Sequence, residues 1–167
     1  MQTGDHGGPI FTYPFSAHSL STGGPSDLWC VTAPSNSRLT VREVVIGQYS
    51  EAGDAQAEML SISFLTGSTS TGGGTAISGI NVKRYSGAAS AGSSVTGPST
   101  TLSSTASAAL VRSDSFNVAA GYRYYPVPDE RIEIGLSQRL AIRLSTPNDG
   151  ITINGTLVLQ QTGQTPQ

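Results

Sequence analysis

Charged residues are scarce in this chain. Lys, Arg, Asp and Glu make up only 12% of its 167 residues, against roughly 25% in an ordinary globular domain. Nine cationic and eleven acidic groups give a net charge of −2, and the one adjacent cationic pair is Lys83-Arg84. Because binding to a phosphate backbone requires a basic stripe, we expect no nucleic acid partner.

Long hydrophobic runs are missing as well. No run of about 18 apolar residues occurs, so the sequence predicts no membrane-spanning helix and no membrane partner. Residues 1–9 are polar and Gly-rich, without a basic segment followed by an apolar one. We therefore expect no secretion signal, and assembly in the cytoplasm.

Cysteine and histidine are too few for the common metal and nucleophile sites. The chain has Cys30, His6 and His18, whereas a structural zinc site needs three or four such ligands at close spacing. Cys30 stands in an apolar run, which favours a buried core thiol. A Ser-His-acid site would have to use His18 with Asp27; we expect instead a solvated histidine at a strand end.

Other patterns that could carry chemistry are incomplete. Residues 67–73 have the first spacing of a phosphate-binding loop, but Gly73 stands where the lysine is required. Glu51, Asp54 and Glu58 could offer oxygens to calcium, yet their spacing does not match an EF-hand. A glycosidase carboxylate pair would have to come from Asp114, Asp129, Glu130 and Glu133. We expect no enzyme activity, no cofactor and no metal.

Short stretches of alternating apolar residues, separated by clusters of Gly, Pro, Asn, Asp and Ser, make up most of the chain. This pattern is typical of β-strands in a sandwich or barrel. The expected strands are residues 10–18, 27–33, 38–46, 58–65, 80–82, 109–118, 132–136, 140–144 and 151–159. Residues 67–74 and 86–107 contain almost only small polar residues, Ala and Gly, and we expect long surface loops or an elaborated sheet edge there.

Four local features sharpen this prediction. Pro14 lacks an N–H and indicates an edge strand. In residues 38–46 the alternation slips around Arg42-Glu43, which predicts a β-bulge. Residues 147–150 form a strong turn, which predicts a hairpin of the last two strands. The Asn-Gly step at Gly155 could be a turn, but the apolar parity continues through it, so we expect one strand whose glycine faces a crowded neighbour or a bulge.

A tyrosine cluster follows the strand at 109–118. Tyr and Arg are enriched at protein–protein hot spots, and stacked tyrosines also bind sugars; the alternative is that these aromatics close one end of the core. The first strand carries further aromatics that could contact a partner. The candidate protein-interaction residues are Ile10, Phe11, Tyr13, Tyr122, Arg123, Tyr124 and Tyr125.

The expected fold class is all-β. About eight to ten short strands without helices suit an antiparallel sandwich of jelly-roll type or a barrel, and we predict the jelly-roll-type β-sandwich with long Ser/Thr/Gly-rich loops. Residues 10–160 would form a single domain. Residues 1–9 would form a flexible N-terminal arm, and residues 161–167 a C-terminal tail.

Three segments carry a resemblance to a known family. They read RLTVREVVIGQYSEAGDAQAEMLSISFLTGS, NVAAGYRYYPVPDERIEIG and LAIRLSTPNDGITINGTLVLQQ. In strand order and turn placement they resemble jelly-roll decoration (cement) proteins of tailed bacteriophage capsids, over most of residues 38–161. The resemblance implies a virion protein on the capsid exterior, a homotrimer that binds across neighbouring subunits of the major capsid protein.

By the same resemblance, residues 1–9 and the first strand would contact the capsid, and the Ser/Thr/Gly-rich loops would form the outward tip. An alternative stays open: a phage tail-fibre, spike or baseplate jelly-roll module that binds a host receptor or glycan through its tyrosines. Fold alone does not decide between these roles.

Overall fold

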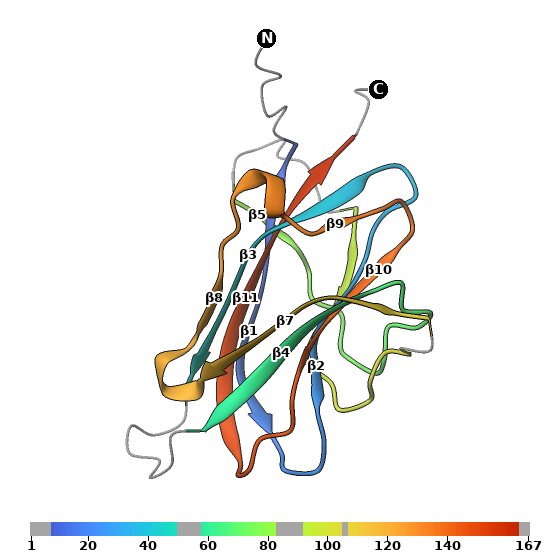
Figure 1. The fold of residues 1–167 in the computed structure, drawn as a ribbon. Coiled ribbons are helices and arrows are strands. Elements are labelled where there is room, and N and C mark those ends of the chain that lie inside the picture. Colours follow the sequence, from blue (N-terminus) through green and yellow to red (C-terminus); the bar gives the residue numbers. More distant parts are fainter. Residues whose placement is uncertain (1–7, 50–57, 83–91, 105–106, 164–167) are drawn as a thin grey trace.

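The structure, a computed structural model, describes residues 8–49, 58–82, 92–104 and 107–163. Within these residues two antiparallel sheets face each other, as Figure 1 shows. The strands are β1 (Ile10–Leu20), β2 (Ser26–Thr32), β3 (Arg38–Gln48), β4 (Met59–Thr66), β5 (Ile80–Asn81), β6 (Ser94–Thr96), β7 (Ala109–Asn117), β8 (Tyr122–Tyr124), β9 (Glu133–Ile134), β10 (Arg139–Leu144) and β11 (Ile151–Thr162). Two short 3-10 helices, η1 (Val118–Ala120) and η2 (Pro128–Glu130), flank β8.

The strand order is that of a jelly roll. Sheet A has the order β5-β1-β11-β3-β8, with β9 also beside β3, and sheet B has the order β6-β2-β10-β4-β7. β8 and β9 follow one another along the same strand β3 and act as one interrupted strand. With these two joined and the short β5 and β6 set aside, each connection crosses from one sheet to the other, except that β4 is followed by its own neighbour β7 in sheet B. This is how two Greek keys build the fold. The predicted fold class is confirmed.

One hydrophobic core lies between the sheets. Side chains on a strand point alternately to its two faces, and the inward ones from both sheets form a single cluster. Its largest members, Trp29, Tyr13, Phe11 and Phe64, have no exposed surface. Each such side chain contributes about 1.5–3 kcal/mol relative to an exposed one, so the core makes the sandwich a firm support for its surfaces.

Pro14 lies where the sequence predicts it. β5 pairs only with Phe11 and Thr12 of β1, so further along β1 no described strand lies on that side. The Ile10 carbonyl accepts from the Val82 amide, and alternation directs the nitrogen of Pro14 to the same side, away from β11. The missing N–H of Pro14 therefore costs no hydrogen bond of the ladder.

The predicted bulge and the continuous last strand are also confirmed. Between the pairs Val158–Glu43 and Leu159–Val41 the register shifts, which leaves Arg42 as the extra residue in β3. β11 runs through the Asn-Gly step without a turn. A Cβ on Gly155 would lie 2.6 Å from the Phe15 ring and 2.7 Å from Trp29, so only glycine fits there without movement.

Three details of the prediction are wrong. The turn at 147–150 joins β10 of sheet B to β11 of sheet A, so it crosses between layers and forms no hairpin. Leu136 is 52% exposed, because β9 ends at Ile134 and a turn follows. β11 passes the predicted end at 159, and Gln161 donates its amide to the Pro9 carbonyl at 3.0 Å.

The Ser/Thr/Gly-rich segments cover part of sheet B. Cys30 pairs with Ala141, and the next pair along the two strands is Trp29 with Ile142, which point into the inter-sheet core. Cys30 and Ala141 therefore face away from that core, yet both are buried. Cys30 is thus buried as predicted, beneath a layer formed by the described loop residues. No helix in the described ranges is long and apolar enough to cross a membrane.

Candidate interaction surface

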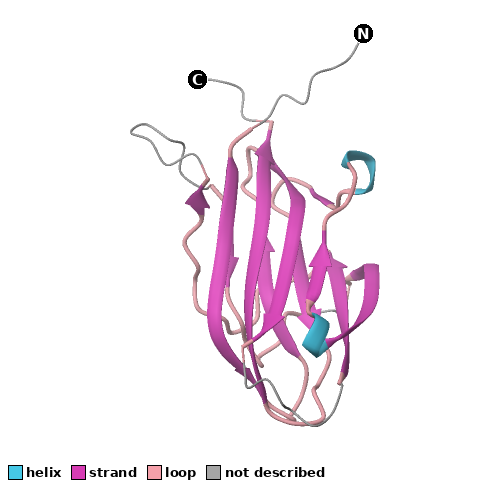
Figure 2. Ribbon diagram, turned by 90° about the vertical axis from the view of Figure 1, so that its left-hand side faces the viewer, coloured by secondary structure: helices cyan, strands magenta, loops and turns pink. Residues whose placement is uncertain are grey.

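The outer side of sheet A is an uncovered surface of the described fold. Figure 2 shows its long strands from outside, with no described element in front of them. We call this surface the A face. Its residues, which alternate with core residues, are Thr12, Pro14, Glu43, Val45, Arg123, Asn154, Thr156 and Val158.

Strand pairing places four of these side chains in one row. Pro14 pairs with Thr156, Thr156 with Val45, and Val45 with Arg123. The row crosses four adjacent strands, and Val45 at its centre is 37% exposed. A row of Pro, Thr and Val side chains that ends at Arg123, on a sheet backed by the core, suits contact with another protein surface.

The residues of the A face include one ion pair, while Arg42 and Glu133 lie on the same side of sheet A but further along β3, toward β9. The ion pair of the A face joins Arg123 Nε to Glu43 Oε1 at 2.8 Å, with the side chains 66% and 22% exposed. An exposed pair of this kind contributes less than about 1 kcal/mol. Docking would therefore desolvate few charges, as is typical of the centre of a protein interface.

The predicted tyrosine cluster is divided by the alternation of β8. Tyr122 and Tyr124 face the core and are 9% and 4% exposed, and their rings pack at 5.2 Å on Phe116 and 5.1 Å on Phe64. These two tyrosines close one flank of the core, which is the alternative the sequence left open.

The other candidate residues are divided in the same way. Phe11 and Tyr13 are buried, Ile10 is half-buried, and Tyr125 is 65% exposed with the Arg123 guanidinium 5.4 Å from its ring centre. A role in binding stays a prediction for the accessible residues Ile10, Arg123 and Tyr125.

A polar group fixes the buried tyrosines. The Tyr122 hydroxyl donates to Asp114 at 2.7 Å, and Arg112 Nε donates to the same carboxylate at 2.6 Å. Burial, and then the bond to Asp114, raises the pKa of Tyr122. Burial would raise the pKa of Asp114, but the bonds from Arg112 and Tyr122 outweigh it and hold this pKa below its usual value. The group holds a carboxylate and a neutral phenol together at the flank of the sandwich.

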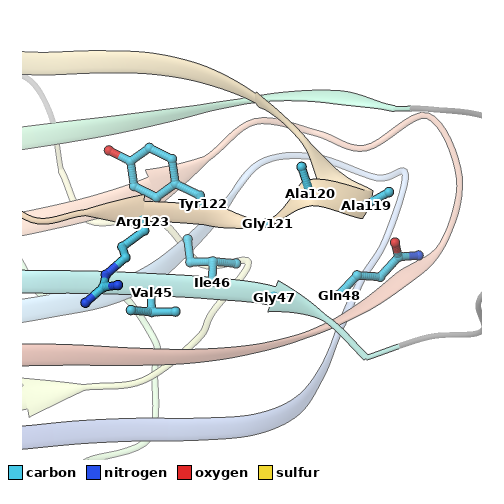
Figure 3. A pocket seen from close by; sticks show the side chains of 9 residues that line it. All are labelled: Val45, Ile46, Gly47, Gln48, Ala119, Ala120, Gly121, Tyr122 and Arg123. Atoms are coloured by element: carbon cyan, nitrogen blue, oxygen red, sulfur yellow. The ribbon is translucent and has the colours of Figure 1, made fainter.

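A shallow groove of about 380 Å³ adjoins the A face where β3 ends beside η1 and β8. Figure 3 shows its lining, residues 45–48 and 119–123. Gly121 has φ +71°, and a Cβ there would lie 2.8 Å from the Ile46 carbonyl oxygen. The lining is aliphatic and small apart from Gln48, Tyr122 and Arg123, so it suits an apolar side chain of a partner better than acid–base chemistry.

The candidate histidine and aspartate of a triad serve other contacts. Asp27 is buried and accepts from Arg143 Nε and from the Ser103 amide, both at 2.6 Å. The His18 ring stands edge-on to Phe15, and burial lowers its pKa. The Asp27 carboxylate is therefore occupied as a structural anchor.

The remaining candidates are spread over the fold. Glu58 accepts from the Asn148 amide, while Glu51 and Asp54 lie outside the described residues. Gly73 donates its amide to the Thr101 carbonyl, inside the loop layer. Asp129, Glu130 and Glu133 are exposed. In the part of the chain that the structure describes, no three His, Cys, Asp or Glu residues are grouped to hold a metal ion.

Sequence reasoning missed the ion pair of Asp27 with Arg143, which anchors the loop layer. Arg143 Nη2 also donates to the Ser103 carbonyl at 3.0 Å, and Asp27 exchanges two backbone hydrogen bonds with Ser99. The one available signal was an aspartate at the start of an apolar strand. Nothing in the sequence links it to an arginine more than a hundred residues away.

Comparison with known proteins adds no relative. No protein-family model matches the chain, and no curated protein matches it.

Proposed function

We propose that this protein decorates and stabilises the outside of an icosahedral phage head, as a homotrimer that binds across neighbouring major capsid subunits. The A face is the observation that carries the proposal. It is uncovered, carries few charges and is backed by a closed core, and these are the properties of a surface that holds neighbours together. The sequence resemblance supplies the identity of the partner.

The charges of the described fold also favour a structural role. Asp27 binds Arg143, Glu43 binds Arg123, and Asp114 binds Arg112. Each of these carboxylates is committed to holding strands or loops, so we propose that the protein acts by binding and performs no catalysis.

Gly8 and Pro9, the described residues of the proposed N-terminal arm, are hydrogen-bonded to the end of β11. The Gly8 and Pro9 carbonyls accept from side-chain and backbone nitrogens at the end of β11. In Figure 1 both ends of the described chain lie at the same end of the sandwich. Gly8 and Pro9 therefore lie at one end of sheet A, and we propose that the arm and the A face contact one partner together.

Binding to capsids tests the proposal. The purified chain should add saturably to undecorated heads of the phage that encodes it, measured by co-sedimentation. Val45→Lys places a charge in the centre of the A face and should abolish binding, since an unpaired charge in a desolvated interface is costly.

Met59→Lys is the matched control. Met59 is 61% exposed and lies on the outer side of sheet B, so this variant should bind like the unmodified chain. No saturable binding by the unmodified chain would contradict the proposal, as would equal binding by the two lysine variants.

The second candidate is a tail-fibre, spike or baseplate module that binds a host receptor or glycan. The exposure of Tyr125 beside Arg123 favours it, since an accessible ring can stack on a sugar. It predicts that Tyr125→Ala abolishes adsorption to host cells while binding to tailless heads is absent. Binding of the chain to tailless heads would contradict it.

A further inference from the structure

β7 is the outermost described strand of sheet B. It pairs with β4 from Met59–Asn117 to Thr66–Ala109, and no described strand pairs with its other side. Most of its residues are exposed. A free edge of this length is a template on which another strand can be added.

The directions of the backbone N–H and C=O groups show which residues of β7 can pair with a further strand. The Val118 amide donates to the Glu58 carbonyl, so alternation turns the N–H and C=O groups of Phe116 and Asp114 toward β4. Ser113 and Ser115 direct theirs away from β4. The edge thus offers unpaired donors and acceptors centred on these two serines.

Arg112 and Asp114 form an ion pair within one chain, and their opposite charges are also complementary to a second copy of the same strand. With Ser113 of two antiparallel copies opposite each other, each Arg112 stands opposite Asp114 of the other copy. Directly opposed Cβ atoms lie about 4.5–5.5 Å apart, and the two side chains are 44% and 27% exposed. Centring the pair on Arg112 or Asp114 would instead oppose like charges.

We propose that two copies of this chain associate through their β7 strands, antiparallel about Ser113, so that the two B sheets become one. Charges on an edge strand usually discourage pairing. Here a second copy supplies the opposite charges, so Arg112 and Asp114 disfavour unrelated strands and select this partner and register. This twofold contact does not depend on the proposed capsid function.

A proline at the centre of the β7 edge tests whether backbone hydrogen bonds join the two copies. Ser113→Pro removes an N–H that points away from β4 and leaves the bonds to β4 in place. It eliminates the two hydrogen bonds at the centre of the contact, so association should weaken about tenfold or more. Ser113→Ala keeps the N–H and should associate like the unmodified chain, with sedimentation equilibrium as the measurement.

Mixing charge variants tests the register. Arg112→Asp opposes Asp to Asp in its own pair, and Asp114→Arg opposes Arg to Arg, so each variant alone should associate more weakly than the unmodified chain. An equal mixture aligns opposite charges on both sides and should form a 1:1 complex. Circular dichroism and thermal melting establish that each variant is folded. If a charge variant is unfolded, the comparison of Ser113→Pro with Ser113→Ala tests the β7 contact instead.

The mass in solution separates this inference from the proposed function. The β7 contact alone gives a dimer, a threefold contact alone gives a trimer, and both together give a hexamer. A monomer or a trimer at every concentration would overturn the inference, and so would a dimer that Ser113→Pro leaves intact. A dimer that Ser113→Pro dissociates, but that never binds capsids, supports the inference and contradicts the capsid role.

Discussion

Substitution of Asp27 by Asn should destabilise the fold far more than its position near a turn suggests. The Asp27 carboxylate is 1% exposed and accepts from Arg143 Nε, Arg143 Nη2 and the Ser103 amide. Asn keeps one acceptor oxygen, but its NH₂ group would face donors. Arg143, only 16% exposed, would then be left without an opposite charge.

The magnitude follows from this burial. Removing one partner of a buried ion pair costs about 3–5 kcal/mol, because the remaining charge is uncompensated. Glu43→Gln is the matched control, since the Glu43–Arg123 pair has the same chemistry at the surface. Its loss should cost less than about 1 kcal/mol.

Urea unfolding of the two variants measures both costs as the free energy of unfolding. Hydrogen exchange gives a second readout, because the Ser103 amide loses its charged acceptor and should exchange faster in Asp27→Asn than in Glu43→Gln. Similar stability losses in the two variants, with Ser103 still protected, would refute the view that the Asp27–Arg143 pair anchors the loop layer.

Two further predictions concern the core. Gly155→Ala should lower the free energy of unfolding by about 1–3 kcal/mol, because the added methyl group overpacks against Phe15 and Trp29. In Gly47→Ala the added Cβ would meet nothing within 4 Å, so the same urea unfolding measurement should change by no more than about 0.5 kcal/mol. Equal effects of the two substitutions would contradict the crowding at Gly155. Burial, then the charge of Asp27, raises the pKa of Cys30 from 9.0 to about 12. The folded state thus keeps a neutral thiol where the unfolded chain ionises, so stability should fall by up to about 1.4 kcal/mol per pH unit from this group between pH 9 and 12. In Cys30→Ala this part of the pH dependence should disappear, and an unchanged slope would contradict the assignment.

The alternation of apolar residues predicted the longer strands and their inward faces, but not the three-residue strands β6 and β8. Leu60, Ile62 and Phe64 face the core of β4 as their spacing predicts. The slip around Arg42-Glu43 and the parity across Gly155 gave the bulge and the continuous strand, because a period of two is visible within one segment. The same period separates Tyr122 and Tyr124 from Arg123 and Tyr125, and could have predicted their division.

Long-range pairing was not predictable in the same way. Alternation shows that a strand has a buried face but not which sheet it joins, so a strong turn at 147–150 was interpreted as a hairpin. Composition suggested surface loops or an elaborated sheet edge for the Ser/Thr/Gly-rich segments, and it could not show that they cover sheet B. Their cover over Cys30 depends on Asp27 and Arg143, whose contact is set by the pairing of β2 with β10.

The central claim is that the A face holds neighbouring capsid subunits. A cryo-electron microscopy reconstruction of the intact phage particle tests it most directly. We expect density for this sandwich on the outside of the head, at threefold positions, with Val45 and Thr156 against the major capsid protein. Density for the chain only on the tail, or on the head with the A face turned to solvent, would contradict it.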